Sequence, residues 1–197
     1  GLAEALDRAR EDGVPVFAAT DHVRIRRVGD AEVPEPADAE GGGEDVRPGA
    51  PDPHFWTDPA SMRRVSAAIA TALGERPGID VGARAADLDR RLARLDAETE
   101  QSLAVIPPDR RKLVTGHESM GYFARRYGFE LVGAIVPGLS SQARASATEL
   151  ADLVRVIRRE GVDVVFTEAG TPWRVAEAVA EETGARLVEL PATRLPD

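Results

Sequence analysis

The apolar residues change their spacing near the middle of the chain. Up to residue 105 they recur at intervals of three and four, as in Met62, Val65, Ile69 and Leu73. This spacing predicts amphipathic helices over residues 2–12, 59–73 and 83–105. After residue 107, short apolar runs alternate with helical stretches, and that alternation predicts parallel βαβ units with right-handed crossovers.

Turn and capping residues mark where these elements begin and end. Pro59 occupies a first helical position, and Ser146 with Glu149 forms a capping box. Residues 14–18 form a short apolar run, which predicts a buried strand in the first half of the chain. In the second half we expect helices between four strands, at residues 112–115, 130–136, 162–167 and 186–190.

The predicted helix over residues 83–105 is long for a domain of this size. At 1.5 Å per residue it extends roughly 30 Å, which is enough to join two lobes. We therefore expect an α/β protein with two lobes of parallel βαβ units joined by one linker helix. Residues 1–81 are expected to be the C-terminal part of an N-terminal lobe, residues 82–106 the linker, and residues 107–197 the C-terminal lobe.

The first lobe is expected to be incomplete, because the chain starts without methionine inside a predicted helix. Residues 31–52 are rich in proline, glycine and acid, with seven carboxylates against one arginine. Such a segment buries too little apolar area to order itself, so we expect a flexible acidic loop.

Composition removes several classes of function. The 197 residues include no cysteine, which excludes disulfides, thiolate ligands and cysteine nucleophiles. The formal net charge of −9 argues against nucleic-acid binding. No run approaches the ~20 apolar residues that span a bilayer. No glycine-rich phosphate loop and no ordered catalytic triad is present.

Two of the three histidines lie at predicted junctions. His54 stands in the Pro-flanked stretch 52–59 just before a helix, and His117 stands in residues 114–119 between a strand and a helix. The prolines restrict the backbone around His54. Our hypothesis is that both imidazoles bind one transition-metal ion, and the alternative is that both are structural turn histidines. His22 has no such setting and is interpreted as a surface residue.

Glu168 ends a predicted strand, at the sheet edge where ligands of α/β proteins gather. It is a candidate metal ligand. It could instead orient His117 from outside the coordination sphere, or serve a structural role.

Three stretches together resemble the zinc and manganese solute-binding proteins of ABC importers, in order and spacing over nearly the whole chain. They are Asp52-Pro-His-Phe-Trp-Thr-Asp-Pro59, Val114-Thr-Gly-His-Glu-Ser-Met-Gly-Tyr-Phe-Ala-Arg-Arg-Tyr-Gly128, and Val165-Phe-Thr-Glu168 with Ala180-Glu-Glu-Thr-Gly184. The resemblance implies two α/β lobes joined by a rigid helix, with the metal in the cleft between the lobes.

By this resemblance, His54 is a ligand from the end of the first lobe and His117 the first ligand of the second lobe. The family's earliest histidine would lie upstream of Gly1. Its final carboxylate usually follows the last strand, where this chain has Thr193, so Asp197 or Glu168 are the substitutes. The segment 31–52 stands where zinc-binding relatives often carry a loop rich in histidine and acid, but it contains no histidine.

The function we expect is extracytoplasmic, high-affinity binding of zinc, with manganese as the alternative ion, and its delivery to an ABC transporter permease. The chain is expected to be monomeric, to bind no nucleic acid, and to reach the membrane only through a missing N-terminal anchor or the permease. Nitrogen ligands favour zinc, whereas carboxylates favour harder ions. A mononuclear zinc hydrolase with Glu168 as general base is the alternative, and a plain α/β interaction domain is a third.

Overall fold

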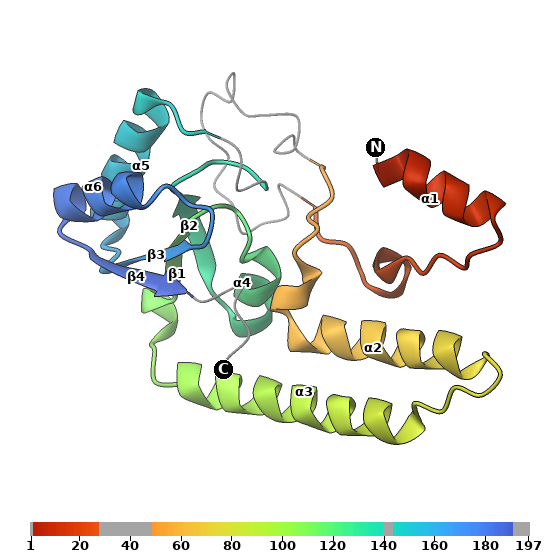
Figure 1. Ribbon diagram of the computed structural model, residues 1–197. Coiled ribbons are helices and arrows are strands. Elements are labelled where there is room, and N and C mark those ends of the chain that lie inside the picture. Colours follow the sequence, from red (N-terminus) through yellow and green to blue (C-terminus); the bar gives the residue numbers. More distant parts are fainter. Residues whose placement is uncertain (1, 28–48, 140–143, 191–197) are drawn as a thin grey trace. The chain divides into compact units, whose positions relative to one another are not determined.

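A computed structural model describes residues 2–27, 49–139 and 144–190 of the chain (Figure 1). The chain divides into two compact units. One unit comprises Gly1–Arg24 and Pro59–Asp96, and the other comprises Ile25–Asp58 and Ala97–Asp197. Residues 25–58 thus belong with the second half of the chain, and the predicted division at residues 81 and 106 stays a prediction.

The first unit contains helices in its described part. They are α1 (Leu2–Glu11), the short 3-10 helix η1 (Ala19–His22), α2 (Pro59–Gly74) and the greater part of α3 (Gly82–Leu103). The three helices predicted from apolar spacing are confirmed to within two residues at each end. None of the described helices in the chain is both long and apolar enough to cross a bilayer.

The strand predicted at residues 14–18 is wrong. These residues follow α1 without forming a strand, and Val14 is 53% exposed. A strand needs a neighbour for its backbone hydrogen bonds, and the described residues of the first unit include none. Phe17 instead stacks on the ring of His22, with ring centroids 4.8 Å apart.

The second unit is built on a parallel four-stranded sheet. The strands β1 (Lys112–Thr115), β2 (Glu130–Ala134), β3 (Val164–Glu168) and β4 (Arg186–Leu190) lie in the order β2-β1-β3-β4. The connecting helices are α4 (Gly121–Tyr127), α5 (Ala147–Glu160) and α6 (Trp173–Thr183). The predicted parallel βαβ arrangement is confirmed, with the Ser146 and Glu149 capping box at the start of α5.

Alternating side chains of β1, β2 and β3 pack on opposite faces of the sheet. Leu113 and Leu131 belong to one apolar cluster with Ala124 and Tyr127 of α4. Their neighbours Val114 and Val132 belong to another cluster, which also contains Val165, Leu153, Val154 and Ile157 of α5, and Ala176 and Val179 of α6. Burial on both faces is typical of a doubly wound α/β sheet.

The direction of winding reverses between β1 and β3. From β1 the chain passes to β2 on one side, whereas β3 and β4 lie on the other side of β1. In open parallel sheets, ligands bind beyond the carboxyl ends of the strands at such a reversal. His117 follows β1 and Glu168 is the last residue of β3, so both stand at this edge.

Candidate metal centre

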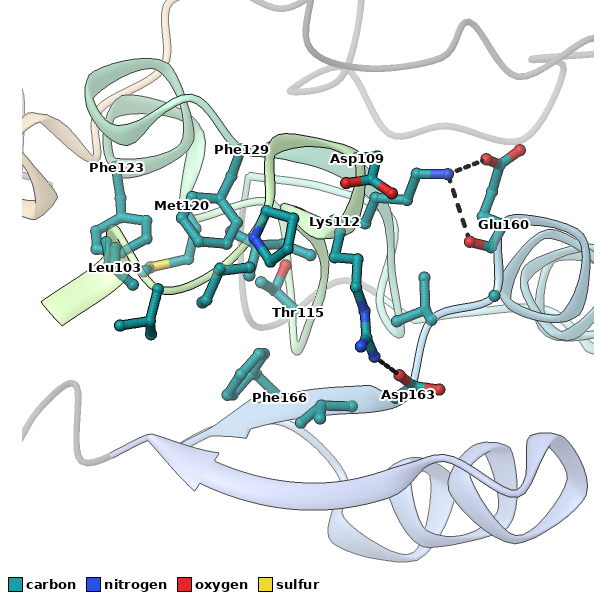
Figure 2. A pocket seen from close by; sticks show the side chains of 18 of the residues that line it. Leu103, Asp109, Lys112, Thr115, Met120, Phe123, Phe129, Glu160, Asp163 and Phe166 are labelled. Atoms are coloured by element: carbon teal, nitrogen blue, oxygen red, sulfur yellow. Dashed lines mark hydrogen bonds and ion pairs between the residues drawn. The ribbon is translucent and has the colours of Figure 1, made fainter. Parts of the chain in front are cut away.

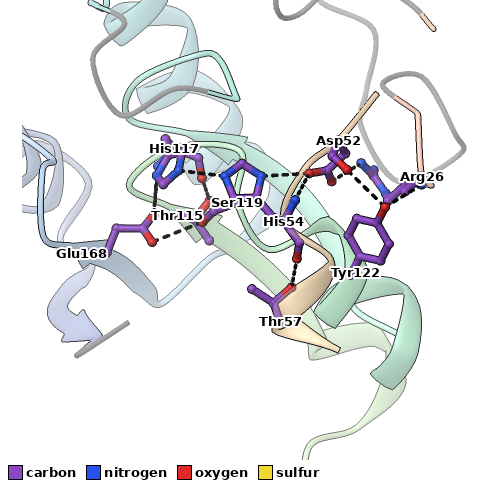
Figure 3. Close-up of polar contacts among 9 residues, drawn as sticks. All are labelled: Arg26, Asp52, His54, Thr57, Thr115, His117, Ser119, Tyr122 and Glu168. Atoms are coloured by element: carbon purple, nitrogen blue, oxygen red, sulfur yellow. Dashed lines mark hydrogen bonds and ion pairs between the residues drawn. The ribbon is translucent and has the colours of Figure 1, made fainter. Parts of the chain in front are cut away.

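His54 is held by a tight turn that Asp52 organises. The carboxylate Oδ1 of Asp52 accepts a hydrogen bond from the backbone N–H of His54 at 2.9 Å, and it lies 2.8 Å from the ring Nδ1 (Figure 3). An Asp side chain that bonds two residues ahead is a usual way of closing a turn. The hydroxyl of Thr57 donates to the carbonyl of His54 at 3.0 Å, which fixes the other side of the residue. His54 is 5% exposed.

The second carboxylate oxygen of Asp52 pairs with a buried arginine. Nη1 of Arg26 lies 3.2 Å from Oδ2, and both side chains are almost completely buried. The hydroxyl of Tyr122 donates to the carbonyl of Asp52 at 3.1 Å and accepts from the backbone N–H of Arg26 at 2.7 Å. Burial raises the pKa of Tyr122, because the charged phenolate would lose its hydration.

His117 lies in the loop between β1 and α4, and hydrogen bonds on both sides hold this loop. The hydroxyl of Thr115 and the backbone N–H of Ser119 both donate to the carbonyl of His117, at 2.7 and 2.8 Å. The backbone N–H of Glu118 donates to the carbonyl of Gly138 at 3.0 Å. The loop is therefore attached both to β1 and to the segment that follows β2.

Glu168 meets His117 from the neighbouring strand. Its Oε1 lies 2.7 Å from Nδ1 of His117 and also accepts from the backbone N–H at 3.3 Å, while Ser119 Oγ donates at 3.0 Å (Figure 3). The contact between Glu168 Oε1 and His117 Nδ1 has the distance of an ion pair, but its angles are not those of a hydrogen bond. Burial alone would raise the pKa of Glu168, but the contacts with His117 and Ser119 outweigh it, so the pKa lies below its usual value.

The two histidine rings converge through their remaining nitrogens. Nε2 of His54 lies 3.3 Å from Nε2 of His117, and the ring planes are inclined by 70°. Two imidazole nitrogens bound to one tetrahedral zinc ion at about 2.0 to 2.1 Å would stand roughly 3.3 to 3.4 Å apart. Each ring also has a carboxylate at Nδ1, which is the usual arrangement around metal-bound histidines.

Among the described residues, no three His, Asp or Glu side chains lie close enough together to hold one metal ion. Glu168 contacts the Nδ1 side of His117, away from the Nε2 pair. Asp197 and most of the acidic segment 31–52 lie outside the described residues. His22 belongs to the first unit, where it is exposed and stacks on Phe17.

Four residues of this site were not singled out from the sequence: Arg26, Asp52, Ser119 and Tyr122. Only Asp52 carried a readable signal, because an aspartate two residues before a histidine can close a turn on it. Arg26 and Tyr122 are distant from residue 52 along the chain, and their contacts depend on the tertiary fold.

An apolar pocket of about 690 Å³ lies elsewhere in the second unit (Figure 2). Its lining includes Leu103, Met120, Phe123, Phe129 and Phe166, with the ion pairs of Lys112 with Glu160 and of Arg110 with Asp163 at its margin. None of the three candidate ligands lines it. The pocket is therefore separate from the histidine pair.

A family model described as "ZnuA: Zinc-uptake complex component A periplasmic" matches residues 1–196. The chain belongs to this family. Among curated relatives it is similar to the zinc-binding protein TroA of Treponema pallidum, with 31% identity over 139 residues that cover 68% of this chain. It is also 32% identical over 138 residues to the high-affinity zinc uptake system protein ZnuA of Paracoccus denitrificans.

Solved structures of the family share this fold. The periplasmic zinc-binding protein TroA of Treponema pallidum superposes with a TM-score of 0.73 at 24% identity, covering 98% of this chain and 67% of that one. A zinc-bound ZnuA deletion mutant matches 72% of this chain and 53% of its own, with a TM-score of 0.62 at 30% identity. The chain spans 44% of the curated TroA and 41% of the curated ZnuA, which is less than half of each.

Proposed function

We propose that this chain binds a transition-metal ion, most favourably zinc, between His54 and His117, as part of a solute-binding protein of an ABC importer. The 3.3 Å separation of the two Nε2 atoms supports this proposal most directly. Zinc is favoured because the convergent donors are imidazole nitrogens, which suit zinc better than they suit harder ions such as manganese. The ion is cargo, and it is delivered to a membrane permease on the extracytoplasmic side.

We propose that Glu168 orients His117 and is not itself a metal ligand. The ion is then bound by the two imidazole rings and by further donors. Its contact with Nδ1 supports this role, because a carboxylate at that position directs Nε2 outward. Glu168→Gln should then weaken zinc binding about 10- to 100-fold while keeping one ion per chain. Loss of the bound ion altogether would instead support direct ligation by Glu168.

The hydrolase alternative requires Glu168 to face a metal-bound water as general base. The side chain instead contacts His117 Nδ1 and the hydroxyl of Ser119, so the geometry favours binding over catalysis. A screen with ester and phosphoester substrates in the presence of zinc tests this point, and turnover that is lost in Glu168→Gln would support the hydrolase.

The deciding experiment is a zinc titration of the chain and of three single variants. His54→Ala and His117→Ala should each abolish stoichiometric zinc binding, because each removes one of the two convergent nitrogens. His22→Ala is the matched control, since that ring is exposed and stacked on Phe17. Wild-type binding in both site variants would refute the shared metal site.

A further inference from the structure

Asp52 uses both carboxylate oxygens inside the protein. Oδ1 faces the backbone N–H and ring Nδ1 of His54, and Oδ2 faces the guanidinium of Arg26 (Figure 3). The side chain is fully buried. A buried carboxylate is costly unless it is paired and hydrogen-bonded, and Asp52 has an arginine on one side and two nitrogens on the other.

The chemistry of this contact determines which nitrogen of His54 carries a proton. An ionised carboxylate only accepts hydrogen bonds, so the ring atom 2.8 Å from Oδ1 must be the donor. In a neutral imidazole, a proton on Nδ1 leaves Nε2 with a free electron pair. That pair points to the 3.3 Å gap between His54 and His117.

Arg26 occupies the other oxygen of Asp52. Its guanidinium, which is always charged in proteins, lies 3.2 Å from Oδ2, so that Oδ1 is left to face His54. The guanidinium of Arg26 packs directly against the backbone of Gly121. Only glycine allows this, because a β-carbon at residue 121 would lie 2.6 Å from Cζ of Arg26. Tyr122, the next residue, ties the backbones of Arg26 and Asp52 together.

We propose that Asp52 is a positioning residue of the metal centre, which keeps the proton of His54 on Nδ1 and presents the unprotonated Nε2 toward His117. Its effect on zinc affinity rests on the proposed function. The effect on the ring proton is a property of the metal-free chain. The two can therefore be tested separately.

Asp52→Asn is the most informative variant, because it keeps the size of the side chain but removes one acceptor. The amide oxygen can face Arg26 or the backbone and ring N–H groups of His54. The charged guanidinium is the stronger single partner, and choosing it costs the hydrogen bond from the backbone N–H of His54. Its NH₂ group then faces Nδ1 of His54, which must become an acceptor. The proton is expected to move to Nε2, the atom that should bind zinc.

Nitrogen-15 NMR of the metal-free chain shows directly which ring nitrogen of His54 carries the proton, because protonated and unprotonated ring nitrogens have well-separated chemical shifts. The spectra are recorded about two pH units above the usual histidine pKa of ~6.5. Wild-type His54 should carry its proton on Nδ1 and Asp52→Asn should carry it on Nε2, with zinc affinity reduced about 10- to 100-fold. His22→Ala is the control, because that ring is exposed and stacked on Phe17, so His54 should keep its proton on Nδ1.

Two results would overturn the proposal. One is a proton on Nε2 of His54 in the wild-type chain, which needs no variant and so does not depend on Asp52→Asn folding. The other is an Asp52→Asn chain with the wild-type proton position and zinc affinity. A wild-type chain that takes up no zinc would refute the proposed function, while the NMR result would still decide the role of Asp52.

Discussion

The backbone of Gly116 packs against the side-chain hydroxyl of Thr171, with no room between them for a β-carbon. A β-carbon at residue 116 would also come within 3.2 Å of Cγ of Glu168. Thr171 belongs to the turn that follows β3, where its backbone N–H donates to the carbonyl of Glu168 at 3.0 Å. The missing side chain at Gly116 thus lets this turn reach the loop that carries His117.

Gly116→Ala is therefore expected to separate Glu168 from His117. Overpacking of this kind usually costs about 1 to 3 kcal/mol in the free energy of unfolding. Zinc affinity should fall at least about tenfold, as it does when an outer partner of a metal-binding histidine is lost. Urea unfolding and zinc calorimetry measure the two effects.

Gly74→Ala is the matched control for this substitution. Gly74 ends α2, its φ is not positive, and a β-carbon there would meet nothing within 4 Å. Its zinc affinity should equal that of the wild type. If Gly116→Ala has the same stability and the same zinc affinity as Gly74→Ala, then the packing at Gly116 does not position Glu168.

Acid should remove the stabilisation that Glu168 provides. Because the folded pKa of Glu168 is below its ordinary value of 4.5, its contribution is fully present above pH 4.5 and is lost as pH falls through the folded pKa. Wild type should thus be more stable than Glu168→Gln at neutral pH, with the difference shrinking below pH 4.5. Urea unfolding of both metal-free chains between neutral and acid pH checks this, and a difference that grows in acid would contradict it.

Zinc affinity is expected to fall in acid, because neutral imidazole is the form that binds metal and protons compete with the ion for the same nitrogens. If both rings must lose a proton, the apparent affinity should approach a loss of about 100-fold per pH unit in acid. Calorimetry in buffers of different ionisation enthalpy counts the protons released. Equal affinity at acid and neutral pH would contradict ligation by the two histidines.

The second half of the fold could be predicted closely because local signals there agree with the tertiary structure. The bounds of β1 and β4 are those predicted, and Gly128, Gly161 and Gly184 follow α4, α5 and α6 with positive φ. The strand predicted from the apolar run at Val14 was wrong, because an apolar run does not by itself provide a neighbouring strand to pair with. A strand is defined by its partner, and a sequence window does not contain the partner.

The site could be predicted only where chemistry and local geometry coincide. His54 and His117 each stand at a junction that the sequence marks, and the structure brings their Nε2 atoms within 3.3 Å. Arg26 gave no signal, because an arginine in a polar stretch is usually solvated and only the fold shows its pairing with Asp52. Glu168 could be placed at the correct edge, but its contact with Nδ1 of His117 depends on the register of β3 beside β1.

Tyr122→Phe should destabilise the second unit and change its behaviour in alkali. Loss of the hydroxyl leaves the buried N–H of Arg26 without its acceptor, which typically costs about 1 to 3 kcal/mol in the free energy of unfolding.

Because burial raises the pKa of Tyr122 above its ordinary value of 10.0, this contribution is fully present below pH 10 and is lost as pH rises through the folded pKa. Urea unfolding of the wild type and Tyr122→Phe should show a constant difference from pH 7 to pH 10 that narrows above pH 10. Other titrating groups are common to both chains and cancel in the difference. A difference that widens in alkali would mean that the folded state favours the phenolate, against the burial of this hydroxyl between Arg26 and Asp52.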